Sequence, residues 1–268
     1  MSDLQRKVQQ HRTASPTDKP VGSADEEPDY ECSTCKDQTG WIEMVDGQEV
    51  WKRCKCVETR KLKRLIKASE ITEEFRKLTF GNFKVEGKEE IVIQAFECAK
   101  SYFCEYPEIK STRKNSIALL GQPGAGKTHL LTALSNNLIV KKKQHVVYFP
   151  YVEGFDDLRN DFDQLEEKMT HMRNADVLFI DDLFKPVRDS KGKRKPKYSE
   201  WILEKLYNVI NHRYLNHKPL LISSELLIDD MLAIDEALAT RIYEMCRDFI
   251  VIIQGDPLKL NHRVEGLK

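Results

Sequence analysis

The chain has 268 residues, enough for one core domain of about 150–200 residues with a smaller module beside it. Basic and acidic residues balance at 43 each, so only local clusters of charge can argue for a nucleic-acid partner. No run of 18 apolar residues occurs and the first 26 residues are polar, so we expect a cytoplasmic protein with no signal peptide and no membrane contact. Thiols stay reduced in the cytosol, where neighbouring cysteines indicate a metal site more often than disulfides.

The N-terminal part divides by composition into three segments. Residues 1–29 are polar without apolar periodicity, which predicts a flexible tail. Residues 30–58 contain two short alternating stretches separated by Asp46-Gly47, a pattern that predicts a β-hairpin. Residues 59–68 carry apolar side chains at helical spacing among basic ones and predict a linker helix.

Four cysteines in the hairpin module predict a structural zinc ribbon. Cys32-x2-Cys35 is followed after 18 residues by Cys54-x-Cys56, so two turns each present a thiolate pair to one tetrahedral site. A module of this size has too few apolar side chains to fold on its own core, and bound Zn²⁺ would supply the missing stability. Free thiols in a disordered arm, a redox pair and an iron–sulfur cluster remain alternatives.

Residues 69–268 alternate between apolar stretches and helical patterns. The expected strands span 116–120, 146–149, 177–180, 220–224 and 249–253. The expected helices span 89–105, 127–141, 153–173, 199–215 and 234–246. Continuous apolar strands that alternate with helices predict an α/β domain with a five-stranded parallel sheet covered on both faces.

The stretch GQPGAGKT follows the first of these strands and opens a helix, which predicts a Walker A loop. Glycines let the backbone amides wrap around phosphate, Lys127 reaches the β- and γ-phosphates, and the Thr128 hydroxyl ligates Mg²⁺. We therefore expect ATP and Mg²⁺ as ligands. The predicted nucleotide-binding residues are Gly121, Gln122, Pro123, Gly124, Ala125, Gly126, Lys127, Thr128 and His129.

Asp181 directly follows the apolar run VLFI and is predicted to be the Walker B ligand of Mg²⁺. Asp182 is the candidate for polarising the attacking water, and its short side chain predicts slow hydrolysis because many related ATPases have Glu there. Ser223 and Ser224 end the fourth strand, where ATPases of the AAA+ type place a polar sensor residue, and Glu225 could share that role.

One arginine is expected to act on a neighbouring subunit. Arg241 lies on a helix after the fourth strand, the region from which AAA+ oligomers extend an arginine finger to the next γ-phosphate. A surface salt bridge is the alternative role for Arg241. Arg247 and Arg213 are weaker candidates for the finger or for a phosphate contact.

A basic segment, Lys185 to Lys197, follows the predicted Walker B strand. Its proline and glycine residues predict a loop, and its charge suits the phosphates of single-stranded DNA without sequence readout. A solvated basic loop without a ligand is the alternative. The predicted DNA-binding residues are Arg188, Lys191, Lys193, Arg194, Lys195 and Lys197.

Together the stretches ITEEFRKLTFGNF, GQPGAGKTHLLTAL, VLFIDDLFK, NHRYLNHKPLLISSE and ALATRIYEMCRD resemble the DnaC-type replicative helicase loaders, specifically the phage and prophage branch in Firmicutes. The resemblance covers roughly residues 69–255. It implies an AAA+ core without a C-terminal lid domain, so Arg263 is a poor candidate for a lid-borne sensor arginine.

The resemblance also implies a function. An ATP-dependent oligomer would bind the replicative ring helicase through the cysteine module and deliver it to single-stranded DNA. Two other functions stay open: a nucleotide-switched adaptor or inhibitor of the helicase with little turnover, and a transposition helper of the IstB type.

Overall fold

The computed structural model describes residues 30–158, 162–188 and 192–264. The chain divides into two compact units, Met1–Cys56 and Val57–Lys268, and each is described by itself. The tail expected over 1–29 lies outside the described residues. Within the described ranges no helix is both long and apolar enough to cross a membrane.

The first unit contains the expected hairpin. Strand β1 (Gly40–Val45) pairs antiparallel with β2 (Gln48–Arg53), and Val45 lies opposite Gln48. The two-residue turn Asp46-Gly47 has φ values of 51° and 79°, the left-handed geometry of the tight hairpin turn for which Asp-Gly is typical. The hairpin prediction is confirmed.

The second unit is built on one five-stranded sheet, in the order β4-β5-β8-β3-β9. Every neighbouring pair in it is parallel, as the continuous apolar runs predicted. The strands are β3 (Ile117–Gly121), β4 (Val146–Pro150), β5 (Val177–Asp181), β8 (Leu220–Ser224) and β9 (Ile250–Ile253).

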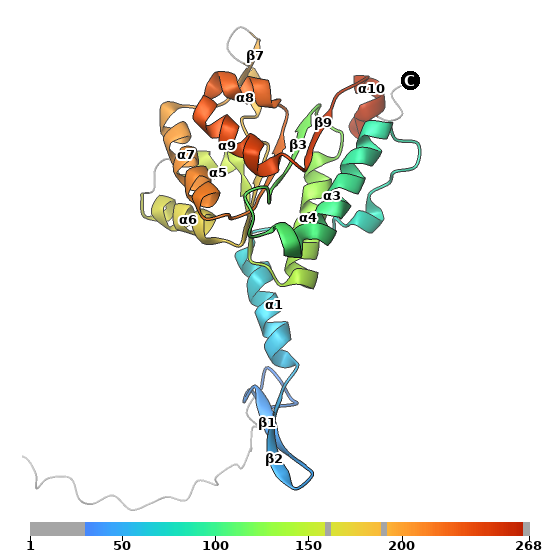
Figure 1. Cartoon of the computed structure of the whole chain (residues 1–268), viewed down its shortest axis with the longest axis vertical. Coiled ribbons are helices and arrows are strands. Elements are labelled where there is room, and N and C mark those ends of the chain that lie inside the picture. The colour runs from blue at the N-terminus through green and yellow to red at the C-terminus, as the bar shows by residue number, and fades with distance from the viewer. Residues whose placement is uncertain (1–29, 159–161, 189–191, 265–268) are drawn as a thin grey trace, which may run out of the picture. The chain divides into compact units, whose positions relative to one another are not determined.

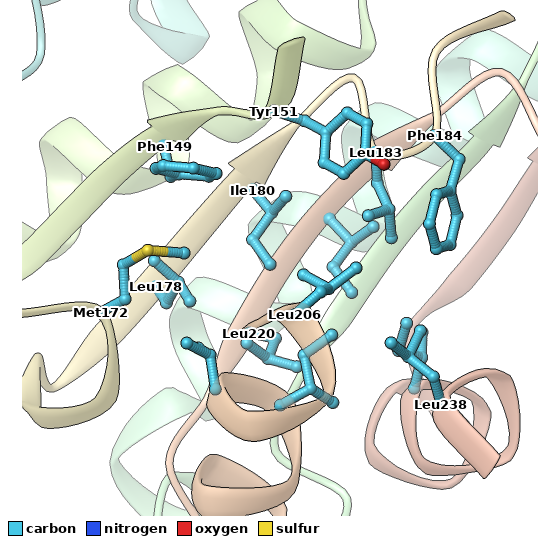
Figure 2. Close-up of a cluster of buried hydrophobic side chains, with 14 of the residues drawn as sticks. Phe149, Tyr151, Met172, Leu178, Ile180, Leu183, Phe184, Leu206, Leu220 and Leu238 are labelled. Atoms are coloured by element: carbon cyan, nitrogen blue, oxygen red, sulfur yellow. The ribbon is translucent and has the colours of Figure 1, made fainter. Parts of the chain in front are cut away.

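Side chains of successive strand residues point to opposite faces of this sheet and build two cores. Leu178 and Ile180 of β5 pack in one core with α6 (Phe162–Asn174), α7 (Glu200–Leu215) and α9 (Glu236–Cys246). Val177 and Phe179 pack in the other core with α3 (Glu90–Ile109) and α4 (Lys127–Lys142). Figure 1 shows α3 and α4 on one side of the sheet and α6, α7 and α9 on the other. Figure 2 shows part of the first core, where Leu178 and Ile180 face Leu206 of α7.

The longer helices follow the expected order, and the short helices α2, α8 and α10 are additional to those expected. The helices are α1 (Cys56–Ala68), α2 (Glu73–Arg76), α3 (Glu90–Ile109), α4 (Lys127–Lys142), α5 (Tyr151–Leu158), α6 (Phe162–Asn174), α7 (Glu200–Leu215), α8 (Ile228–Ile234), α9 (Glu236–Cys246) and α10 (Pro257–Leu260). The helix expected over 153–173 is described as α5 and α6, and residues 159–161 between them are not described. Helix α8 was not expected because its seven residues are too short to show a period; Asp230 caps it by accepting from the Leu227 amide at 2.9 Å.

The basic segment contains two short strands among its described residues, so the prediction of a loop was wrong for these strands. Strand β6 (Pro186–Arg188) pairs antiparallel with β7 (Arg194–Pro196), and Pro186 lies opposite Pro196. Proline is tolerated in a two-stranded ribbon, where its missing N–H can face away from the partner strand. The pair β6–β7 is called the basic ribbon below. Lys191 falls in the undescribed residues 189–191.

No lid domain follows the sheet within the described residues. After β9 the chain forms only α10 and a short 3₁₀ turn, His262–Val264. This agrees with the expected AAA+ core without a helical lid.

Candidate nucleotide and metal sites

The predicted Walker A loop connects β3 to α4 at the carboxyl edge of the sheet. Gly124 has a φ of 77°, and a Cβ there would lie 1.9 Å from Oδ1 of Asn261. Only glycine therefore fits both the backbone and the close approach of the C-terminal segment. His262 holds the same loop, since its amide donates to the Gly124 carbonyl at 3.2 Å.

Lys127 is buried at the start of α4. Its ammonium donates to the carbonyls of Gly121 at 2.8 Å and Gln122 at 2.7 Å. Burial lowers the pKa of Lys127 to about 8, and the carboxylates of Glu225, Asp182 and Asp181 oppose that shift. The site therefore holds a desolvated ammonium that gains from an anionic ligand.

Three side chains hold the Walker B carboxylate of Asp181. Thr128 Oγ1 donates to its Oδ1 at 2.9 Å and the Tyr148 hydroxyl donates to its Oδ2 at 3.2 Å. The Ser223 hydroxyl also donates to Oδ1. Burial raises the pKa of Asp181, and the Ser223 and Thr128 bonds oppose that shift. Tyr148 was missed by sequence reasoning, because its contact with Asp181 depends on the pairing of β4 with β5.

Asp182 stands in a different environment from Asp181. Its backbone φ is 57°, its amide donates to Ser223 Oγ at 2.8 Å, and its carboxylate forms an ion pair with Lys185. Ser223 thus contacts both aspartates. Ser224 points elsewhere: its hydroxyl donates to the Leu183 carbonyl at 2.6 Å and accepts from the Leu226 amide at 3.0 Å, which braces the loop after β5.

These groups surround a cavity of about 450 Å³. It is lined by Phe75, Leu78, Pro123, Gly124, Gly126, Lys127, Thr128, His129, Tyr148, Pro150, Glu153, Asp181, Asp182, Lys185, Glu225, His262 and Arg263. The sequence did not predict Glu153, His262 or Arg263 in this wall. Arg263 was expected to be a poor candidate for a lid-borne sensor arginine; it lies in the short turn after α10, which places it in this wall. Gln122 is turned away, since its side-chain amide donates to the Gly255 carbonyl at 2.9 Å.

A second cavity of about 230 Å³ adjoins the Walker A loop and shares Gly124, Gly126, His129 and His262 with the first. Phe83, Val92 and Leu260 give it apolar walls, and Ala125 and His129 also line it. The His129 ring is fixed by contacts at 3.1 Å with the Thr79 carbonyl and 3.0 Å with Asn82 Oδ1. An apolar cavity with a few fixed polar groups beside a phosphate loop suits a flat heterocycle such as a base.

The arginines take different places. Arg213 is fully buried and donates to backbone carbonyls of Met172, Arg173, Ala175, Asp176 and Pro219. A phosphate or intersubunit contact by Arg213 is therefore ruled out.

Arg241 does not line the nucleotide cavity among the described residues. Its Nε donates to Asn211 Oδ1 at 3.0 Å, and its guanidinium lies over the rings of Tyr207 and Tyr214. The role of Arg241 as a finger toward another subunit stays a prediction.

The basic ribbon is tied to acidic side chains of its own unit. Arg194 forms an ion pair with Glu225 and Lys197 one with Asp156. Arg188 donates to the Gly192 carbonyl at 3.0 Å. Lys193 and Lys195 stand on the same ribbon and are exposed. Whether these residues bind DNA stays a prediction.

The four cysteines of the first unit meet as predicted. Their sulfur atoms all lie within 4.8 Å of one another, with 3.7 Å between Cys32 and Cys54 and 3.4 Å between Cys35 and Cys56. A tetrahedral zinc with bonds of about 2.3 Å separates its sulfurs by about 3.8 Å, so the arrangement fits this ion. The turn after the first pair is fixed by Asp37, whose Oδ1 accepts from the Cys32 amide at 2.9 Å.

Comparison with known proteins shows the family to which the chain belongs. The model of the bacterial DnaA ATPase domain matches residues 75–246. Phage-like element PBSX protein XkdC of Bacillus subtilis (strain 168) is 56% identical over 239 residues, which cover 89% of this chain and 88% of that protein. The chain belongs to the family of the bacterial DnaA ATPase domain, and with it to the AAA+ P-loop ATPases.

Superposition on solved structures shows which known proteins share the fold of this chain. The DnaC helicase loader superposes with a TM-score of 0.56 at 19% identity, over 68% of this chain and 100% of that one. Replication initiator DnaA bound to AMPPCP and single-stranded DNA superposes with a TM-score of 0.53 at 21% identity, over 70% of this chain and 52% of that one. The resemblance to the phage-type DnaC-like branch is thus confirmed by a phage-element relative and by a shared fold.

Proposed function

We propose that this protein is an ATP-dependent loader that binds a replicative ring helicase and delivers it to single-stranded DNA. The observation that carries the proposal is the assembled pocket of Lys127, Thr128 and Asp181 on the fold of the DnaC helicase loader. The relative XkdC is named as a protein of a phage-like element, which supports a role for this chain in the replication of mobile DNA.

The nucleotide chemistry follows from the two cavities. The β- and γ-phosphates would lie at Lys127 and the amides of the Walker A loop, and the base in the cavity of Phe83, Val92 and Leu260. Mg²⁺, which would be held by Thr128 and Asp181, supplies charge neutralisation at the phosphates. Of the chain's own groups, Ser223 orients Asp181, and Asp182, Glu153 and Glu225 are the carboxylates that face the same cavity.

The helicase contact is assigned to the cysteine module. In the register of the hairpin, Ile42 lies opposite Trp51, and Met44 stands two residues along on the same face. Their exposures are 61%, 56% and 62%, so the zinc-held hairpin presents an apolar face of the kind that protein interfaces bury.

The DNA contact and the oligomer follow from the second unit. The basic ribbon would line the path of a single strand, where Lys193 and Lys195 meet phosphates. In an ATP-dependent oligomer Arg241 would leave Asn211 and reach the γ-phosphate of the neighbouring subunit.

A non-catalytic adaptor is the second candidate, and one observation favours it. The carboxylate of Asp182 is engaged with Lys185 and is therefore not free to polarise water. Such a protein would bind the helicase in a nucleotide-dependent way with little turnover.

The test combines native mass spectrometry with an ATPase assay. The full chain, mixed with the host ring helicase and ATP, should form a complex that carries zinc and nucleotide. Trp51→Glu should abolish the complex, while Val50→Glu, on the other face of the hairpin, should not. Turnover with single-stranded DNA that disappears in Lys127→Ala supports the loader, and a complex without turnover favours the adaptor. Unchanged binding by Trp51→Glu would contradict the assigned contact.

A further inference from the structure

Two ion pairs connect the basic ribbon to acidic residues of the nucleotide cavity. Lys185, directly before β6, pairs with Asp182, and Arg194 of β7 pairs with Glu225. The two pairs differ in burial. The Glu225 side chain is 10% exposed, whereas that of Arg194 is 48% exposed, so the arginine joins a buried carboxylate to the surface of the ribbon.

Glu225 stands at the phosphate end of the cavity. It lines the wall together with Lys127 and Asp182. Burial lowers the pKa of Lys127, and Glu225 is the carboxylate that opposes that shift most. Lys127 is the residue that reaches the β- and γ-phosphates. The negative charge of Glu225 would therefore act on the γ-phosphate as well.

We propose that Arg194 is shared between the nucleotide pocket and a polyanion on the ribbon, so that single-stranded DNA weakens the hold on a nucleoside triphosphate. This inference rests on the proposed function and adds to it a path of regulation between its two ligands. With the ribbon free, Arg194 neutralises Glu225 and the pocket accepts the γ-phosphate. When DNA phosphates engage Arg194, Glu225 keeps its negative charge without its partner and repels the γ-phosphate.

Linkage fixes two consequences. The effect is reciprocal, so a bound triphosphate weakens DNA binding by the same factor. A diphosphate lacks the group nearest to Glu225, so its affinity should respond little. Bound DNA therefore shifts the pocket from the triphosphate toward the diphosphate state.

The experiment measures the dissociation constants of Mg²⁺·AMPPCP and Mg²⁺·ADP by calorimetry, with and without a saturating 20-nucleotide oligothymidylate. AMPPCP prevents hydrolysis during the titration. We expect the oligonucleotide to weaken AMPPCP roughly three- to tenfold, the range for an ion pair that is half exposed on one side. The constant for ADP should change by less than about twofold.

Three variants locate the effect. Glu225→Gln should bind AMPPCP at least as tightly as the native chain and lose the response to the oligonucleotide. Arg194→Ala should bind AMPPCP weakly even without the oligonucleotide. Arg188→Ala is the matched control, because it removes a ribbon cation that donates to the Gly192 carbonyl and not to a carboxylate of the cavity. It should weaken DNA binding but keep the response.

The failures can be told apart. If both ligands bind without affecting each other, or if Glu225→Gln keeps the full response, the inference is wrong and the proposed function stands. If the oligonucleotide does not bind at all, both the DNA contact of the proposed function and the inference fall.

Discussion

The Thr128 hydroxyl donates to Oδ1 of Asp181 at 2.9 Å, which brings together the Walker A and Walker B residues that were expected to share Mg²⁺. The contact joins the start of α4 to the end of β5 across the carboxyl edge of the sheet. The two oxygens are therefore close enough to each other to share one Mg²⁺.

Replacement of Ser223 should weaken the use of Mg²⁺ without removing nucleotide binding. Its hydroxyl donates to Asp181 and accepts from the Asp182 amide at 2.8 Å. Partners that orient a metal ligand typically contribute a factor of 10–100 in metal affinity or activity. For Ser223→Ala we expect turnover to need roughly 10- to 100-fold more Mg²⁺, measured as the half-maximal Mg²⁺ concentration at saturating ATP.

Ser224→Ala is the matched control for this prediction. Ser224 braces the loop after β5 by bonding the Leu183 carbonyl and does not reach Asp181. Its loss should lower thermal stability and leave the Mg²⁺ dependence in place. Equal shifts in both variants would show that Ser223 has only a structural role.

Nucleotide binding should fall at alkaline pH because Lys127 has a pKa of about 8 in the free protein. Phosphate stabilises the ammonium, so the pKa of Lys127 rises on binding and the complex takes up a proton above pH 8. Affinity should be level below pH 8 and fall by up to about tenfold per pH unit above it. Calorimetry in two buffers of different ionisation enthalpy measures the proton uptake.

Lys127→Arg is the control for the pH dependence. A guanidinium stays charged over this range, so the variant should bind less tightly but with no fall between pH 8 and 10. A native chain with a flat profile would contradict the low pKa of Lys127.

The sheet and the Walker residues were accessible to sequence reasoning because their signals are local. The run VLFI predicts a buried strand, and Asp181 follows it wherever the rest of the chain packs. Tyr148 and Arg263 were not accessible in this way. Tyr148 meets Asp181 through the pairing of β4 with β5, and Arg263 lies in the cavity wall because α10 returns the chain to the Walker A loop.

The basic ribbon and Arg213 are two cases in which sequence reasoning suggested a structure or a role that the packing does not bear out. Lys185–Lys197 has the proline and glycine content of a loop, and the pairing of Pro186 with Pro196 has no signature in composition. Arg213 looks like any charged helix residue. Only the packing of α7 shows that it serves carbonyls between α6 and β5 and before β8.

Replacement of Arg213 should destabilise the second unit strongly. The side chain is fully buried and its donors serve five backbone carbonyls. An apolar side chain would remove these bonds, and the Pro219 carbonyl would keep only the bond from the Leu178 amide. We expect Arg213→Met to lower the free energy of unfolding by more than about 3 kcal/mol, measured by urea denaturation and circular dichroism.

Arg241→Met is the matched control, with an expected loss of about 1 kcal/mol for a partly exposed arginine. Equal losses in the two variants would contradict the structural role assigned to Arg213.

Removal of the metal should unfold the cysteine module and spare the nucleotide site. The hairpin presents most of its apolar side chains to solvent, with Trp51 56% and Met44 62% exposed, so the four sulfurs within 4.8 Å are what can hold it together. We expect one zinc per chain by mass spectrometry, and loss of it in Cys35→Ser or with a strong chelator. The contribution of Trp41 and Trp51 to the near-ultraviolet dichroism should be lost, while that of Trp201, which packs on the core of the second unit, and AMPPCP binding persist. Cys104→Ser, an exposed cysteine outside the cluster, should retain the zinc and the dichroism. Visible absorbance with iron in place of zinc would identify a cluster instead, and an intact dichroism after chelation would contradict the structural role of the metal.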